Sequence, residues 1–136
     1  MKRLLALVLG LMLSGLALAQ IKVVYHLSDG VPQASRAIGN IRNHLAADPS
    51  AKIVVVTHGA GIDFLLDGAT TPQNQPFAGS VSDLANKGVE FRVCNNTLVA
   101  RNIPADKVVM EAKIVPSGVA EVARLQAKEG FVYLRP

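Results

Sequence analysis

The 136-residue sequence lacks several features that would identify or stabilise a small protein on their own. It contains a single cysteine, Cys94, so no disulfide can form within one chain. It has no basic cluster, which gives little reason to expect binding to nucleic acid or to a membrane surface. Internal repeats, linkers and low-complexity segments are also missing. These absences predict one domain whose apolar core, helped by contacts between copies of the chain, supplies the stability.

One long apolar run is present, and it lies at the N-terminus. Two basic residues precede apolar residues 4–18, and residues 17–19 form the small-x-small pattern that signal peptidase recognises. The run is shorter than the roughly 20 residues of a membrane-spanning helix, and no stop-transfer charges follow it. We therefore expect residues 1–19 to be a signal peptide cleaved between Ala19 and Gln20, and not a retained membrane anchor.

Cleavage would change the protein that remains. It would shorten the chain from 136 residues to 117 and lower the formal net charge from +4 to +2, because Lys2 and Arg3 leave with the signal. No cysteine follows the cleavage motif, which argues against a lipoprotein anchor. We expect a single domain over residues 20–136 that is periplasmic or secreted and has no stable membrane anchor.

The rest of the chain alternates short β-branched runs with segments of helical periodicity. Nearly continuous apolar strands suit a parallel sheet that is covered on both faces, and helical segments follow most of them. Right-handed crossovers then give a three-layer α/β/α domain with a mainly parallel sheet. Strands are expected at residues 21–26, 52–58, 89–94, 112–115 and 131–134.

Helices are expected in the connections between these strands. The first begins near Pro32, because proline is favoured in a first turn, and it ends at Asp48, which precedes another proline. A second helix stops at Gly88, and the last is capped by Ser117 and terminated by Gly130. The residues of the last helix that are expected to face the core are Val119, Val122, Ala123 and Leu125.

Three reactive side chains lie at or near the ends of the first three predicted strands. His26 ends the first strand, His58 the second and Cys94 the third. In open parallel α/β sheets, ligands bind beyond the carboxyl ends of the strands. We therefore expect these three side chains to point toward the same edge of the sheet. His44 lies on the polar side of the first helix, where only solvation is expected.

Cys94 is the strongest candidate for chemistry. The following residues predict a short helix with Asn95 or Asn96 as its N-cap. Free N–H groups and the helix macrodipole stabilise a thiolate at such a position, and thiolate attacks sulfane sulfur and disulfides. The alternative is a small buried apolar residue, because free cysteine is often buried. Export favours a functional thiol, since an unused exposed thiol is a liability in an oxidising compartment.

His26 and His58 are candidates for assisting groups. A neutral histidine can accept the thiol proton or position a substrate anion, whereas the alternative for each is a strand-end histidine bonded to loop backbone. The glycines within residues 58–61 could bring backbone N–H groups to an anion, but a tight strand-to-helix connection explains them equally well. A zinc or copper site built from His26, His58 and Cys94 has suitable ligand types but lacks paired spacing. We expect neither a metal nor another cofactor.

Three segments of the chain resemble the DsrE/DsrF-like family of small sulfur-relay proteins. They are KIVVVTHGAGIDFLL at 52–66, FRVCNNTLVARNI at 91–103 and IVPSGVAEVARLQAKEGFVYLRP at 114–136. The resemblance extends over nearly all of the chain after the signal. It implies a five-stranded parallel sheet with helices on both faces, often assembled into homo-oligomers, either trimers or hexamers.

The resemblance also implies a role for the cysteine. In sulfur-transferring members a cysteine just after the third strand carries a persulfide and passes its outer sulfur to a partner protein, and Cys94 has that position here. This suggests a periplasmic sulfur carrier that exchanges sulfur with donor and acceptor proteins, with His26 and His58 as assisting groups. A non-catalytic module that binds a small ligand, or serves assembly, on the same scaffold is the alternative.

Overall fold

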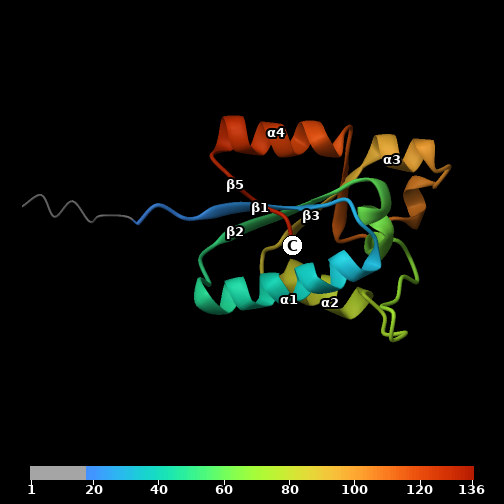
Figure 1. The fold of residues 1–136 in the computed structure, drawn as a ribbon, viewed down its shortest axis with the longest axis horizontal. Helices are drawn as coiled ribbons and strands as arrows, with labels where there is room; N and C mark the ends of the chain where they lie inside the picture. The colour runs from blue at the N-terminus through green and yellow to red at the C-terminus, as the bar shows by residue number, and fades with distance from the viewer. Residues whose placement is uncertain (1–17) are drawn as a thin grey trace, which may run out of the picture.

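The computed structural model describes residues 18–136, which form one five-stranded sheet between two layers of helices (Figure 1). Most of the expected signal peptide lies outside the described residues. The observed strands agree with the predicted ones to within one residue at each end. They are β1 (Lys22–Leu27), β2 (Lys52–Thr57), β3 (Glu90–Cys94), β4 (Ala112–Val115) and β5 (Val132–Leu134).

The sheet has the order β4-β3-β2-β1-β5, and each pair of neighbouring strands is parallel. The chain starts beside the centre, proceeds to β4 at one edge and then crosses back to add β5 at the other edge. The three-layer α/β/α prediction is therefore confirmed, and the sheet is wholly parallel. Because parallel strands end at the same edge, this topology gathers the carboxyl ends of β1, β2 and β3.

Helices cover both faces of the sheet. In Figure 1, α1 and α2 lie on one side, and α3 and α4 lie on the other. Two 3-10 segments, η1 and η2, complete the connections. The bounds are α1 (Val31–Ala47), η1 (Gly59–Leu65), α2 (Ala78–Asn86), α3 (Asn95–Ala100), η2 (Ala105–Lys107) and α4 (Gly118–Glu129). Within residues 18–136, no helix combines the length and the apolar character needed to cross a membrane.

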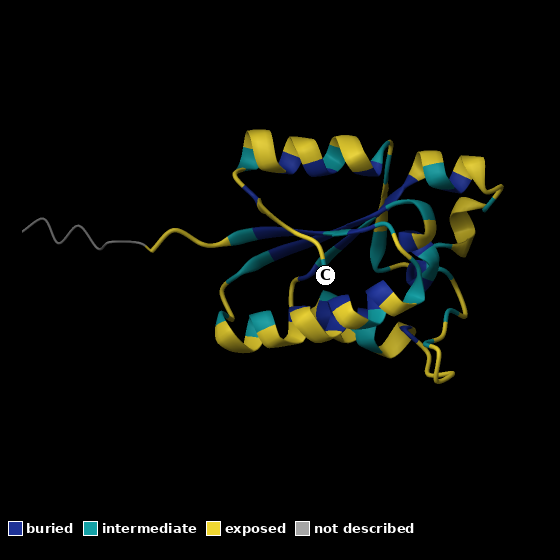
Figure 2. Ribbon diagram, viewed as in Figure 1, coloured by how far each residue is buried: buried dark blue, intermediate teal, exposed yellow. Residues whose placement is uncertain are grey.

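The alternation of side chains along the central strand explains its continuous apolar sequence. In β2, Ile53 and Val55 belong to the larger core beneath α1 and α2, whereas Val54 and Val56 belong to a smaller core beneath α4. All four are buried, and Figure 2 shows the buried residues concentrated where the helices face the sheet. A strand covered on both faces needs apolar residues at every position, as observed.

The last helix is capped as predicted, but only part of its predicted inner face is buried. The Ser117 hydroxyl accepts a hydrogen bond from the Ala120 N–H at 3.4 Å, and Gly130 ends α4 with a left-handed φ of 71°. Val122 and Leu125 are buried, whereas Val119 is 59% exposed and Ala123 is also exposed. The prediction was therefore wrong for those two residues. Val119 lies in the first turn of α4 and lines a surface hollow at the ends of the strands, which leaves it exposed.

Two other local expectations also need correction. The N-cap of α3 is Cys94 itself, with φ −69° and ψ 116°, because the chain passes from β3 into α3 without an intervening loop residue. His44 is more than solvated, since its Nδ1 lies 3.0 Å from the Tyr25 hydroxyl oxygen. The Tyr25 ring belongs to the larger core, and this bond satisfies its buried polar end.

Candidate functional site

Parallel strands bring the three predicted site residues to the same edge of the sheet. Cys94 is the last residue of β3, His58 directly follows β2, and His26 is the penultimate residue of β1. Cys94 pairs with Val115 of β4, and His26 pairs with Val56 of β2. The three residues do not all line the same hollow, however, because its lining includes Cys94 and His58 but not His26.

The Cys94 thiol lies where two helices begin. Cys94 directly precedes α3. Gly118, the first residue of α4, packs against Cys94. Cys94 is only 5% exposed, so reagents would reach the sulfur through the hollow. The backbone N–H groups of Asn96 and Thr97 in α3 and of Gly118 in α4 therefore donate to one sulfur atom, an arrangement that favours negative charge there.

Hydrogen bonds at these helix ends lower the pKa of the Cys94 thiol. Burial by itself raises the pKa, but hydrogen bonds from the backbone of Gly118, from the side chain and backbone of Thr97, and from the backbone of Asn96 outweigh it. The net pKa is below the ordinary thiol value. Cys94 is thus a candidate nucleophile, because thiolate and not thiol is the reactive form.

Gly118 permits the close approach of α4 to both strand ends. A Cβ atom at this position would lie 3.1 Å from the Cβ of His58, 3.1 Å from the carbonyl oxygen of Thr57 and 3.2 Å from the Cβ of Cys94. Such contacts are tighter than nine in ten real Cβ contacts. The absence of a side chain therefore lets the Gly118 N–H reach the sulfur. Sequence reasoning did not single out Gly118, because no local pattern marks a glycine as an inter-element contact.

His58 forms a hydrogen-bonded pair with His26. Their Nε2 atoms are 2.7 Å apart, and their rings are stacked with centroids 4.8 Å apart. The other ring nitrogen of His26, Nδ1, lies 2.6 Å from the hydroxyl oxygen of Tyr133 on β5. Burial, His58 and Arg135 lower the pKa of His26, while Asp29 acts weakly in the opposite direction. The sequence placed the two histidines at one edge but gave no sign of Tyr133.

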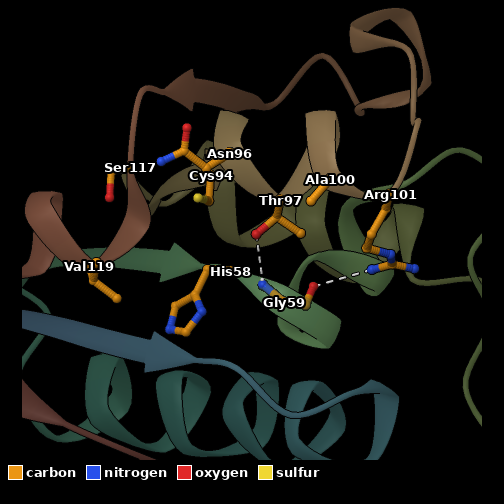
Figure 3. A pocket seen from close by; sticks show the side chains of 9 residues that line it. All are labelled: His58, Gly59, Cys94, Asn96, Thr97, Ala100, Arg101, Ser117 and Val119. Carbon is orange, nitrogen blue, oxygen red and sulfur yellow. Dashed lines mark hydrogen bonds between the residues drawn. The ribbon is translucent and has the colours of Figure 1, made fainter.

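The hollow beside Cys94 has a volume of about 350 Å³, which admits a small thiol compound or a side chain of a partner protein. Arg101 contributes positive charge to its wall, although it also donates hydrogen bonds to the carbonyl oxygen of Gly59 at 3.2 Å and to Asp63 at 2.6 Å. The lining residues are His58, Gly59, Cys94, Asn96, Thr97, Ala100, Arg101, Ser117 and Val119 (Figure 3).

The glycines after β2 serve packing. A Cβ at Gly61 would lie 2.2 Å from the carbonyl oxygen of Leu27, so only glycine fits where η1 passes β1. The Gly59 N–H donates to the Thr97 hydroxyl oxygen at 2.9 Å and is therefore occupied. A tight connection, and not an anion-binding loop, accounts for these residues. Among residues 18–136, no three histidine, cysteine or acidic side chains are arranged to hold a metal ion.

The fold and the site define a small, wholly parallel α/β protein with one cysteine at the carboxyl edge of its sheet. The chain belongs to the DsrE/DsrF-like family, whose sequence pattern matches residues 6–135. The resemblance inferred from the sequence is thus confirmed. No curated protein matches the chain.

Two solved structures have the same fold. MTH1491 from Methanobacterium thermoautotrophicum, a protein of unknown function, is 33% identical with a TM-score of 0.74, and the match covers 86% of this chain and 100% of that one. The ychN protein of E. coli is 12% identical with a TM-score of 0.67, and the match covers 86% of this chain and 98% of that one. The first supports the family and the fold, and the second supports the fold alone.

Proposed function

We propose that this protein is a sulfur carrier that holds sulfane sulfur as a persulfide on Cys94 and delivers it to a partner thiol. The observation that carries the proposal is the position of the Cys94 sulfur between the N-termini of α3 and α4, beside an open hollow. Hydrogen bonds from Gly118 and Thr97 lower the thiol pKa, which favours the thiolate that accepts the sulfur.

The loading step is an exchange between sulfur atoms. The Cys94 thiolate attacks the outer sulfur of a donor persulfide, R–S–SH. A bond forms between Sγ and that sulfur, the donor's S–S bond breaks, and its electron pair leaves on R–S⁻. The products are Cys94–S–SH and R–S⁻, so the exchange needs no external oxidant. Delivery is the same exchange, in which an acceptor thiolate attacks the outer sulfur and releases the Cys94 thiolate.

The location and assembly of the protein belong to the same proposal. The N-terminal basic residues, apolar run and Ala-Leu-Ala motif support export to the periplasm, where donor and acceptor would be exported proteins or small thiols. Exposed apolar side chains on both edge strands support a homo-oligomer, either a trimer or a hexamer. They are Ile114 on β4, and Val132 and Leu134 on β5.

Sulfur loading tests this function directly. The purified protein, incubated with a small persulfide and freed of excess donor, is expected to gain the mass of one sulfur atom. Cys94→Ser should gain none while keeping the circular dichroism spectrum of the wild type. If the wild type takes up sulfur neither from a persulfide nor from thiosulfate, the proposal is contradicted.

Alkylation separates a carrier from a module that only binds a ligand. The rate at which iodoacetamide modifies native Cys94 should follow a titration with a midpoint below that of an ordinary thiol. A slow rate with an ordinary midpoint would instead match a buried structural cysteine and favour the binding module. Thermal stabilisation by a small anion that persists in Cys94→Ala would favour that alternative as well.

A further inference from the structure

The hydroxyl of Thr97 links the start of η1 with the sulfur of Cys94. Its oxygen accepts a hydrogen bond from the Gly59 N–H at 2.9 Å, and Thr97 lines the same hollow as Cys94. Figure 3 shows this hydroxyl on the side of Thr97 that faces Cys94. A threonine hydroxyl has one proton to donate, and an N–H group can only donate. The bond from Gly59 therefore leaves the hydroxyl proton for the sulfur, and the Thr97 side chain does hydrogen-bond to Cys94.

Two residues of α3 hold the backbone of Gly59. Thr97 accepts from its N–H, and Arg101, one turn later, donates to its carbonyl oxygen at 3.2 Å. Gly59 has a left-handed φ of 56°, a conformation that residues with a Cβ rarely adopt. The N–H that orients Thr97 is thus itself fixed by the fold. The bond to Gly59 favours the rotamer of Thr97 that keeps its hydroxyl beside Cys94.

The strength of the bond from Thr97 to the sulfur differs between the empty and the loaded carrier. In the empty carrier the Cys94 thiolate has a full negative charge, and hydrogen bonds to charged acceptors are the strong ones. In Cys94–S–SH the same sulfur atom is bonded to two atoms and is uncharged, so the hydrogen bond to it is weaker. A donor that stabilises the empty state more than the loaded state shifts the exchange toward release of sulfur.

We propose that the Thr97 hydroxyl promotes the release of sulfur, because it stabilises the Cys94 thiolate as the leaving group when an acceptor takes the outer sulfur. This inference rests on the proposed sulfur carriage. In the release step an acceptor thiolate attacks the outer sulfur, and an S–S bond forms between them. The bond from Sγ to the outer sulfur breaks, and its electron pair stays on Sγ, to which Thr97 donates. The exchange needs no external oxidant or reductant.

Substitutions at Thr97 separate the hydroxyl from the rest of the side chain. Thr97→Val removes the hydroxyl and keeps the branched shape, Thr97→Ala removes both, and Thr97→Ser keeps the hydroxyl. Thr57→Val is the matched control, because the Thr57 hydroxyl lies at the same edge of the sheet but donates to the carbonyl oxygen of Arg92 at 3.1 Å. Circular dichroism and thermal melts establish that each variant is folded before its reactivity is compared.

The first readout is the pH dependence of iodoacetamide alkylation. The midpoint should rise by about one pH unit in Thr97→Val and in Thr97→Ala, the effect of losing one hydrogen bond to a charged group. Thr97→Ser should restore most of the difference, and Thr57→Val should match the wild type. This readout reports whether the hydroxyl stabilises the thiolate.

The second readout is the rate of sulfur exchange in each direction, with glutathione persulfide as donor and glutathione as acceptor. Nucleophilicity rises with about 0.4–0.5 of a rise in thiol pKa. Above both alkylation midpoints, loading of Thr97→Val should therefore be about threefold faster than that of the wild type. Release should be about threefold slower, because the two changes together make up a tenfold shift of the equilibrium toward the loaded form. Well below both midpoints, loading should instead be about threefold slower, since less of Cys94 is thiolate.

The outcomes separate this inference from the proposed function. If Thr97→Val slows loading and release by the same factor at every pH, the inference is overturned, because damage to the site affects both directions alike. Unchanged midpoints and rates in folded Thr97→Val and Thr97→Ala would also overturn it, and the sulfur carrier would stand as long as the wild type loads. If the wild type takes up no sulfur, the carrier fails and the role of Thr97 in release fails with it.

Discussion

Gly118 packs against Cys94 so closely that a Cβ atom on the glycine would lie 3.2 Å from the Cβ of the cysteine. The backbone of Gly118 also donates one of the hydrogen bonds that lower the thiol pKa. Packing and reactivity therefore depend on the same contact. A residue that forms no part of the nucleophile controls how near the N-terminus of α4 comes to the sulfur.

Gly118→Ala should destabilise the protein and make the thiol less acidic. The added methyl meets backbone and Cβ atoms that cannot move aside easily, so the start of α4 must shift, at a cost of roughly 1–3 kcal/mol. The lost N–H contact should move the midpoint of Cys94 alkylation to higher pH. Urea unfolding and the alkylation pH profile measure the two effects.

Gly39→Ala is the matched control for this change. Gly39 lies within α1, and a Cβ there would have no neighbour within 4 Å. The substitution should stabilise the helix by about 0.5–1 kcal/mol and leave Cys94 unaffected. Equal alkylation midpoints in the Gly118 and Gly39 variants would contradict the role assigned to Gly118.

An ion pair fixes α4 over β3 beside the thiol. Arg92 lies on the same face of β3 as Cys94 and bonds to Glu121, one turn after Gly118. The side chains of Arg92 and Glu121 are 15% and 12% exposed. Glu121→Gln should therefore lower the free energy of unfolding by about 1.5–3 kcal/mol, the usual value of a hydrogen bond to a charged group.

The exposed pair Lys87–Asp83 provides the comparison for that experiment. Its Nζ and Oδ2 atoms are 3.1 Å apart at an i,i+4 spacing between α2 and its C-cap residue Lys87, and both side chains are about half exposed. Asp83→Asn should cost no more than about 0.5 kcal/mol and leave the thiol unchanged. A cost for Glu121→Gln as small as that for Asp83→Asn would show that the Arg92–Glu121 pair does not anchor α4.

His26 should make the stability of the protein depend on pH. Its pKa in the folded state is lowered from 6.5, so the unfolded chain binds a proton at higher pH than the folded one. Between the two pKa values the unfolded state holds more protons, and stability rises with pH. The stability that a neutral His26 contributes is thus fully present above about pH 6.5, and it is lost as the pH falls toward the folded-state pKa.

Urea unfolding at pH 7.5 and 5.5 measures this effect. The wild type should lose more stability between the two pH values than His26→Gln, which has no titrating ring at position 26. His44→Gln serves as the control, because it removes a histidine from the opposite face and retains the His26–His58 pair. An equal loss in the wild type and His26→Gln would contradict the assigned pKa shift.

The sequence was sufficient for the fold because the signals for it are local. Short apolar runs separated by segments of helical periodicity located the strands. Ser117 capped α4 and Gly130 terminated it as predicted. The sequence was also sufficient to place His26 and Cys94 at one edge of the sheet, because both lie at the carboxyl ends of strands that run parallel. The exposure of Val119 was missed, because a helical stripe alone does not reveal that the first turn of the helix lines a surface hollow.

The parts of the site that sequence reasoning missed depend on distant contacts. Tyr133 lies 107 residues from His26 in sequence and is its neighbour only because β5 pairs with β1. Gly118 reaches Cys94 only because α4 crosses over β3. Neither relationship has a local pattern, since each follows from strand order and from the crossover of α4.

The most direct test of the sulfur carrier follows one sulfur atom through uptake and release. Wild-type protein is loaded with a small persulfide, freed of excess donor and then mixed with an acceptor thiol. Its intact mass is measured by mass spectrometry before loading, after loading and after the acceptor is added. We predict a gain of one sulfur atom that disappears on adding the acceptor, and no gain in Cys94→Ser. A wild-type mass that never changes, or a gain that Cys94→Ser shares, would contradict the assignment of sulfur carriage to Cys94.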